Sequence, residues 1–271
     1  MPTRRRALII IAALLGLAVL SLAIALAAGS LPVTTGDILG ALGGGPGGLE
    51  VEVIRGLRLP RALAAFACGG LLALAGALMQ ILLRNPLADP YVLGISGGAS
   101  VGALSAMLAG LSLALMNVAA FAGALAAMLL VFGLAHGDNS WTRTRLLLTG
   151  VIVASGCGAI VALILSIAPE DGLRGMIFWL MGDLAHALSP SLALAVLALG
   201  LVVALPFARE LNLLARGDSL AHALGVTVRQ VKFGVYLLAS LLTAVAVTTG
   251  GSIGFIGLVV PHMVRLAMIR M

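Results

Sequence analysis

Long stretches without any charged side chain dominate this sequence. No Asp, Glu, Lys or Arg occurs from Ala7 to Gly36, and none occurs from Pro90 to Gly137. A helix of about 20 apolar residues is long enough to cross the hydrocarbon core of a bilayer. Only 10% of the 271 residues are charged and 61% are hydrophobic, which is too little charge to cover a soluble domain. The sequence therefore predicts an all-α, polytopic membrane helix bundle with one transmembrane domain over residues 1–271.

The gaps between charged residues place about eight membrane spans. The first follows Arg4, Arg5 and Arg6; it is longer than a signal-peptide core and has no clear cleavage site, so we interpret it as a retained helix. Residues 170–183 carry charge and fit a half-length helix in the membrane interface. The predicted spans cover roughly residues 7–29, 62–83, 91–110, 114–135, 146–168, 187–208, 233–249 and a last, shorter span from 253.

The basic residues indicate the orientation of the chain. With the N-terminus in the cytoplasm, the inner segments contain 12 of the 16 Lys and Arg residues, as the positive-inside rule expects. These residues lie at the ends of apolar stretches and not on an aromatic-rich soluble face, so we predict no nucleic-acid partner. The four others, Arg55, Arg58, Arg61 and Arg174, lie outside, and this group needs a separate explanation.

Cysteine and histidine give no sign of a catalytic or metal site. Cys68 and Cys157 both lie in apolar runs and suggest neither a disulfide framework nor a zinc site. His262 has no second His, Cys or carboxylate at helical spacing with which to share a metal ion. The chain also lacks the G-x-x-x-x-G-K-[ST] motif that binds ATP phosphates. We therefore predict no catalytic residue, no bound metal and no cofactor in this chain.

Two long motifs resemble those of a family of membrane transporters. The first runs through RLPR (58–61), Gln80, NPLA (85–88), Pro90, LG (93–94) and GA (98–99), and the second is GSIGFIGLVVPHMVR, residues 251–265. In this register both resemble the FecCD or vitamin B12-type permease subunits of ATP-driven importers. The resemblance implies a multi-pass permease of the bacterial cytoplasmic (inner) membrane that is not itself an enzyme. An iron-siderophore is the most frequent cargo of such permeases, and haem and cobalamin stay open.

The resemblance also implies a set of partners. They are a second permease copy, forming a homodimer, two ATP-binding cassette subunits, a periplasmic substrate-binding protein, the metal-chelate substrate and membrane lipid. Residues 209–232 form a polar stretch that we interpret as two short helices, broken at Arg216-Gly217-Asp218 and at Gly225. Their leucines give an apolar face that a solvated loop does not need. This stretch resembles the family's coupling helices, and the matching positions are Asn212, Gly217, Asp218, Ala221, Leu224 and Gly225.

The resemblance implies three further groups of residues. Arg58 and Arg61, with Arg55 a weaker match, correspond to arginines that receive acidic residues of the binding protein, for which the bidentate Arg–carboxylate geometry gives a physical reason. Arg143 and Thr144 fall at the cytoplasmic gate, although Arg143 departs from the family's small hydroxyl residue. The Pro261-His262 pair is expected to end a helix at the inner face. The expected structural positions are Gln80, Asn85, Pro86, Gly94, Gly254, Gly257, Pro261, His262 and Arg265.

The chain end and two alternative functions complete the sequence-based picture. Family members continue with about two further spans, for about ten in all, so we expect the C-terminal end to be truncated. A secondary transporter is one alternative, but it would usually have an Asp, Glu or Lys in the middle of a span, and none occurs here. A rhomboid-like intramembrane protease is the other, because Gly94-Ile95-Ser96-Gly97 matches G-x-S-G and His262 could assist Ser96. That motif is short in a chain with 35 glycines, and nothing marks an oxyanion hole.

Overall fold

The computed structural model describes residues 4–45, 47–135, 142–184 and 190–270, and all regular elements in these ranges are helices. This is the expected outcome in lipid, where a helix satisfies its own backbone hydrogen bonds. The prediction of an all-α membrane bundle is thus confirmed. The longer helices are α1 (Arg4–Ala27), α4 (Leu59–Leu83), α6 (Leu113–Ala135), α7 (Arg143–Ile167) and α12 (Val228–Gly250). The shorter ones are α2 (Thr35–Gly43), α3 (Leu49–Val53), α5 (Ile95–Leu108), α8 (Glu170–Met181), α9 (Pro190–Ala204), α10 (Ala208–Arg216), α11 (Asp218–Ala223) and α13 (Ile256–Arg270), with single turns η1 (Ile54–Arg58), η2 (Pro90–Leu93) and η3 (Leu205–Phe207).

Six helical stretches in the described residues are long and apolar enough to cross a membrane. The predicted spans at 91–110 and from 253 correspond to α5 and α13, which have 14 and 15 residues. At about 1.5 Å per residue, each reaches only some 20 Å, less than the hydrocarbon core of about 30 Å. The count of eight spans and the inner position of the N-terminus stay predictions. The six stretches are Leu8–Ala27, Leu49–Leu83, Leu113–Ala135, Thr144–Ile167, Pro190–Arg216 and Val228–Gly250.

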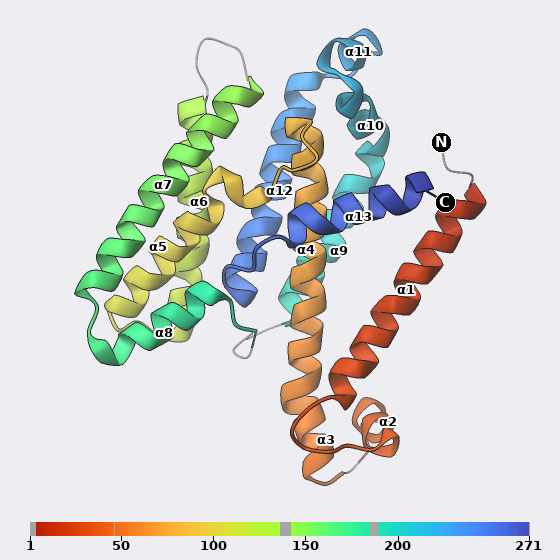
Figure 1. Cartoon of the computed structure of the whole chain (residues 1–271), viewed down its shortest axis with the longest axis vertical. Coiled ribbons are helices and arrows are strands. Elements are labelled where there is room, and N and C mark those ends of the chain that lie inside the picture. The colour runs from red at the N-terminus through yellow and green to blue at the C-terminus, as the bar shows by residue number, and fades with distance from the viewer. Residues whose placement is uncertain (1–3, 46, 136–141, 185–189, 271) are drawn as a thin grey trace.

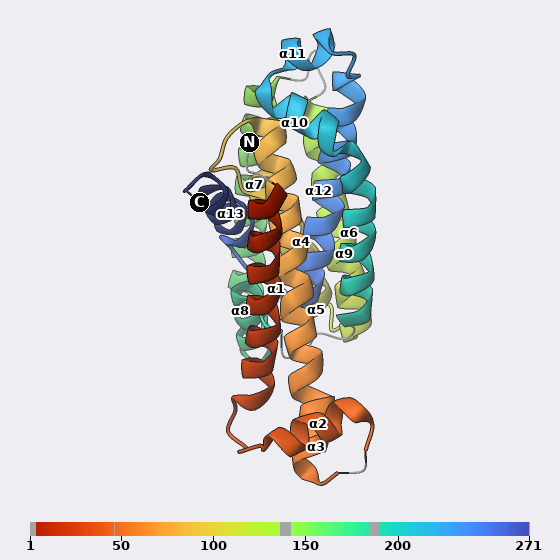
Figure 2. The same cartoon turned by 90° about the vertical axis from the view of Figure 1, so that its right-hand side faces the viewer.

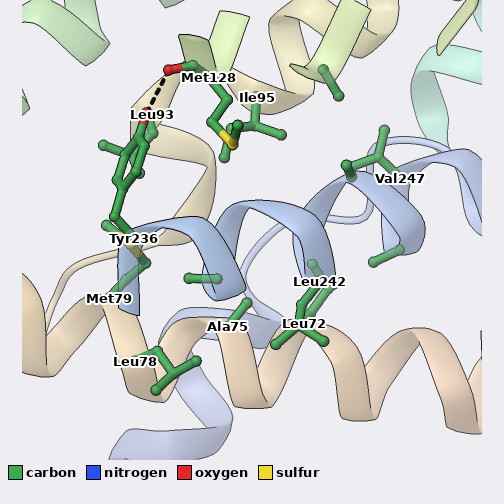
Figure 3. Close-up of a cluster of buried hydrophobic side chains, with 14 of the residues drawn as sticks. Leu72, Ala75, Leu78, Met79, Leu93, Ile95, Met128, Tyr236, Leu242 and Val247 are labelled. Carbon is green, nitrogen blue, oxygen red and sulfur yellow. Dashed lines mark hydrogen bonds between the residues drawn. The ribbon is translucent and has the colours of Figure 1, made fainter. Parts of the chain in front are cut away.

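Helix α4 lies at the centre of the molecule. Figure 1 shows α5, α6 and α7 on one side of α4, α1 on the other side, and α13 lying across it. Figure 2 shows that α10 and α11 lie at one end of the bundle, whereas α2 and α3 lie at the opposite end. The main hydrophobic core, drawn in Figure 3, packs Leu72 of α4 against Leu242 of α12 and also contains Ile95 of α5. Tyr236 of α12 ties this core to α6, because its hydroxyl donates to the Met128 carbonyl at 2.7 Å.

Small residues set the distance between α5 and α6. A Cβ atom added to Gly98 would lie 2.3 Å from the Gly123 carbonyl oxygen, and one added to Gly123 would lie 2.2 Å from the Gly98 oxygen. Two backbones therefore meet where only glycine fits. Close backbone approach of this kind holds membrane helices together, since lipid tails are as apolar as leucine and burial of apolar surface gains little.

The helix that contains α4 begins earlier than the predicted span at 62–83. Residues 49–83 form one helical stretch of 35 residues. At about 52 Å that stretch is longer than the hydrocarbon core, and its charged end is the first turn, which carries Glu50 and Glu52. Pro90 begins the 3₁₀ turn η2, because proline is pre-set for the first position of a helical turn.

Candidate functional site

The end of α4 that lies beside α10 and α11 brings together four of the predicted structural positions. The Gln80 amide nitrogen donates to the carbonyls of Gly257 at 3.4 Å and Leu258 at 3.2 Å. Its amide oxygen accepts from the Arg265 guanidinium. Pro261 has no N–H for the Gly257 carbonyl four residues earlier, so that carbonyl needs another donor. The Gln80 amide is that donor. Gln80 and Arg265, which are 185 positions apart in sequence, therefore meet where α4 contacts α13.

The same crossing depends on glycine. A Cβ atom on Gly76, one turn before Gln80, would lie 1.9 Å from the Gly257 carbonyl oxygen. A Cβ atom on Gly257 would lie 2.8 Å from the Pro90 ring and 3.0 Å from the Leu72 carbonyl oxygen. Glycine at position 257 thus allows α13 to pack closely against α4. Gly254 has open space around it, so close packing gives no reason for glycine there.

The expectation that Pro261-His262 ends a helix was wrong. Both residues lie inside α13, which continues to Arg270. The helix tolerates the proline because Gln80 pairs with the carbonyl that Pro261 leaves without a partner. His262 is half-buried within this helix.

A break in the chain separates α12 from α13. Gly251 has a φ of 73°, and Phe255 has a φ of 67°, a backbone conformation that residues other than glycine rarely adopt. The break therefore lies within the glycine-rich motif at residues 251–265. Within the break, the Ser252 hydroxyl lies 2.9 Å from the Ser96 hydroxyl of α5. The bonding partner of Ser96 is therefore a serine, and no hydrogen bond joins Ser96 to His262 in the described residues, which removes the geometric support for a protease.

The polar stretch after α9 folds as predicted into two short helices, α10 and α11. The first break falls at Gly217, whose φ is 144°, and the second at Gly225, whose φ is 82°. The side chains of Leu211 and Leu214, both in α10, are buried, whereas those of Leu220 and Leu224 are 44% and 53% exposed. One apolar face thus packs on the bundle and another is left outward.

The positions carried over to this segment differ in accessibility. Asn212, Leu224 and Gly225 are exposed, whereas Ala221 is fully buried and packs inside. Asp218 is engaged within the chain. Its carboxylate pairs with the Arg84 guanidinium and accepts from the Lys232 ammonium at 2.8 Å.

The arginines that are predicted to lie outside are mostly occupied by backbone carbonyls. Arg55 donates to the carbonyls of Ala41, Gly40 and Gly45, around the C-terminus of α2. Arg58 donates to those of Leu26, Ala27 and Leu31, at the C-terminus of α1. A cation at a helix C-terminus pairs with unsatisfied carbonyls and with the negative end of the helix dipole. Arg61 is exposed and has no hydrogen bond or ion pair among the described parts of the chain.

The remaining predicted positions lie in turns and at helix ends. Asn85 and Pro86 are exposed, and the Asn85 side chain accepts from the Leu87 N–H at 2.9 Å, which closes the turn after α4. Gly94 has a φ of 74° and ends η2. Thr144 is exposed in the first turn of α7, whereas the side chain of Arg143 lies outside the described residues.

Burial raises the pKa of Asp89, although its carboxylate accepts from the Tyr91 N–H at 2.8 Å.

Sequence reasoning missed three residues that organise these sites. Arg84 belongs to none of the predicted groups of site residues, yet it pairs with Asp218. Lys232 is 7% exposed, and as the one lysine among 16 basic residues it could have drawn notice. Gly76 was one glycine among 35, and nothing in its local sequence marks the contact with Gly257.

Comparison with known proteins decides the family. Residues 4–270 match the profile of the FecCD transport family. The chain belongs to the FecCD transport family. This membership and the six apolar helices make it a multi-pass protein of the cytoplasmic membrane.

Individual relatives agree with this membership. The chain is 44% identical over 222 residues to the hemin transport system permease protein HmuU of Yersinia pestis, covering 78% of this chain and 65% of the relative. It is 41% identical over 219 residues to the cobalamin import system permease protein BtuC of Halobacterium salinarum, covering 79% and 59%. The chain thus spans less than two thirds of the length of these relatives. A solved structure of a metal-chelate type ABC transporter in an inward-facing conformation matches with a TM-score of 0.82 and 30% identity, covering 95% of this chain and 80% of the other.

Proposed function

We propose that this chain is the permease subunit of an ATP-driven importer that moves an iron-siderophore or a related metal chelate, such as haem or cobalamin, across the cytoplasmic membrane. The observation that carries the proposal is the family match from residue 4 to residue 270, which includes the α10–α11 pair at the predicted inner end. Relatives named as hemin and cobalamin permeases support the substrate class. The proposed pore contains two copies of the chain, and ATP is hydrolysed by separate subunits.

ATP-binding subunits dock, in this proposal, on the outward face of α10 and α11. Leu220 and Leu224 are exposed at the end of the bundle, beyond the apolar length of the spans, where an exposed leucine is more typical of an interface than of a solvated loop. Leu224→Asp should abolish co-purification of the ATPase subunits. Leu49→Asp is the matched control, since Leu49 is 63% exposed at the opposite end. Equal co-purification of both variants would contradict docking on this face.

The binding protein docks, in the same proposal, on the outward arginines. Arg61 is the exposed member of the group, whereas the guanidinium of Arg58 is held by α1 carbonyls and supports the surface indirectly. Arg61→Glu should remove the stimulation of ATP hydrolysis by the binding protein, and the Arg58→Glu/Arg61→Glu double variant should do the same. Arg174→Glu is the control, because Arg174 is also exposed but lies on α8. Normal stimulation of the Arg61 variant would refute this assignment.

Gating at the start of α7 is part of the proposal. Thr144 is exposed in the first turn of the helix, and the Thr142 side chain caps that turn by accepting from the Arg145 N–H. The family resemblance of this turn is what supports the proposal that Arg143 and Thr144 line the inner mouth of the pathway.

A further inference from the structure

Three charged residues from three separate elements meet beside α10 and α11. Asp218 is the first residue of α11, Arg84 follows the last turn of α4, and Lys232 lies in the second turn of α12. One carboxylate oxygen of Asp218 pairs with Arg84 and the other accepts from Lys232 at 2.8 Å. The side chains of Lys232, Arg84 and Asp218 are 9%, 21% and 38% exposed. We call this group the inner ion-pair cluster.

Arg84 connects both short helices to α4. Besides its pair with Asp218 of α11, its Nε donates to the Leu214 carbonyl of α10 at 3.1 Å. Arg84 therefore contacts the helices on both sides of the helix break at Gly217. The planar fork of an arginine fixes the direction and the distance of such contacts, whereas apolar packing is non-directional and lets surfaces slide.

No short covalent path joins α4 to these helices. Helix α10 continues from α9, and α11 leads into α12 through residues 224–227, which contain the break at Gly225. Arg84, in contrast, is 130 positions away from Leu214 in sequence. A movement of α10 and α11 reaches α9 and α12 through the chain itself. It reaches α4 through the packing of α9, α10 and α12 on α4, and Arg84 adds charged, directional contacts to that packing.

The backbone at Arg84 points to a role beyond ending a helix. Arg84 has a φ of 46°, the left-handed conformation that favours glycine or asparagine after a helix. Residues that the fold holds in a strained backbone conformation tend to lie at active sites or switch regions. One turn earlier on α4, Gln80 holds α13. The last turn of α4 is thus fastened to the α10–α11 pair through Arg84 and to α13 through Gln80.

We propose that the inner ion-pair cluster is the mechanical link by which a displacement of α10 and α11 moves α4, and with it α13. Arg84 and Asp218 act as positioning residues, because they contact neither nucleotide nor cargo. The inference rests on the proposed function, since the displacement would come from ATPase subunits docked on the exposed face. It assigns to Asp218 an intramolecular role distinct from a docking contact.

Arg84→Gln tests the link cleanly. This variant removes the ion pair between the end of α4 and Asp218 but leaves Asp218 paired with Lys232, so no buried charge is left alone. An environment-sensitive fluorophore is placed at His222→Cys on α11 or at Leu57→Cys near the outer end of the α4 stretch, with Cys68 and Cys157 replaced by serine. Both labelled positions are exposed. The complete transporter with its ATPase subunits is studied in nanodiscs, with ATP and vanadate as the probe.

The expected result is a separation of the two fluorescence responses. Arg84→Gln should keep nucleotide-dependent emission changes at α11 and keep ATP hydrolysis, but lose most of the response at the outer end of α4. Arg84→Lys, which keeps the charge, should recover part of it. Arg216→Gln is the matched control, because Arg216 is exposed two residues before Asp218, and it should keep both responses. The Arg84→Gln/Asp218→Asn double variant should lose no more than Arg84→Gln.

Each other outcome has a defined meaning. If Arg84→Gln keeps both responses, the cluster is not the link. If it loses both while its ATPase subunits still co-purify, the cluster only shapes α11, and the inference is overturned. If the wild-type complex shows no nucleotide response at either position, the proposed function fails as well, which distinguishes the two cases.

Discussion

Gly76→Ala probes the contact between α4 and α13 with a single methyl group. A Cβ atom at Gly76 would lie 1.9 Å from the Gly257 carbonyl oxygen and 2.6 Å from the Gly257 Cα atom. These are backbone atoms of another helix, so no side chain can rotate to make room. The variant must push α13 away from α4.

The energetic consequence follows from two terms. Overpacking in a well-packed interior costs about 1–3 kcal/mol. Moving α13 away also weakens the hydrogen bonds of Gln80, each worth about 0.6 kcal/mol inside a membrane protein. The better helix propensity of alanine returns up to about 1 kcal/mol. We expect a net loss of roughly 1–4 kcal/mol, which lowers the melting temperature by about 3–12 °C for a protein of this size.

Thermal unfolding in detergent, together with hydrogen exchange of residues 256–268, measures this effect. Gly69→Ala is the matched control on the same helix, because a Cβ atom there meets nothing within 4 Å. It should leave the melting temperature unchanged or raise it slightly. If Gly76→Ala were as stable as Gly69→Ala, with unchanged exchange in α13, the close crossing of the two helices would be refuted.

Three further predictions test other parts of the structure. Arg58→Ala should loosen the connection after α1 by about 2 kcal/mol, because charged hydrogen bonds to helix-end carbonyls are lost, and faster proteolysis at residues 28–34 would show it. Burial raises the pKa of the Asp89 carboxyl, so the folded state binds more protons than the unfolded state and the stability of the wild type should fall as pH rises above about 4. Asp89→Asn should remove this fall, and an unchanged slope in pH-dependent unfolding would contradict the prediction. Ser96→Ala should leave transport intact and cost only about 0.6 kcal/mol, and complete loss of activity in a well-folded variant would revive a catalytic role for Ser96.

Features set by neighbouring residues could be predicted from the sequence. The breaks at Gly217 and Gly225 follow from glycine between short amphipathic helices, and the structure has both. The apolar spans follow from the absence of charge over long stretches. The short helix α8 likewise follows from its local pattern of charged and apolar residues.

Features set by distant contacts could not. Gln80 and Arg265 are separated by 185 positions, and only the fold shows that they meet beside the carbonyl that Pro261 frees. The local sequence does not show the contact with Gln80, so a proline at position 261 predicts the end of a helix. Arg58 was assigned to a partner because the local sequence does not show the α1 carbonyls that it binds.

ATP-dependent uptake by the complete transporter in proteoliposomes tests the central claim most directly. Haemin, a ferric siderophore and cobalamin are offered separately, with the ATPase subunits and the binding protein present. The account predicts that one of these chelates accumulates only when ATP is supplied and that vanadate stops it. Accumulation driven by an ion gradient without ATP, or no accumulation of any chelate by a complex that hydrolyses ATP, would contradict it.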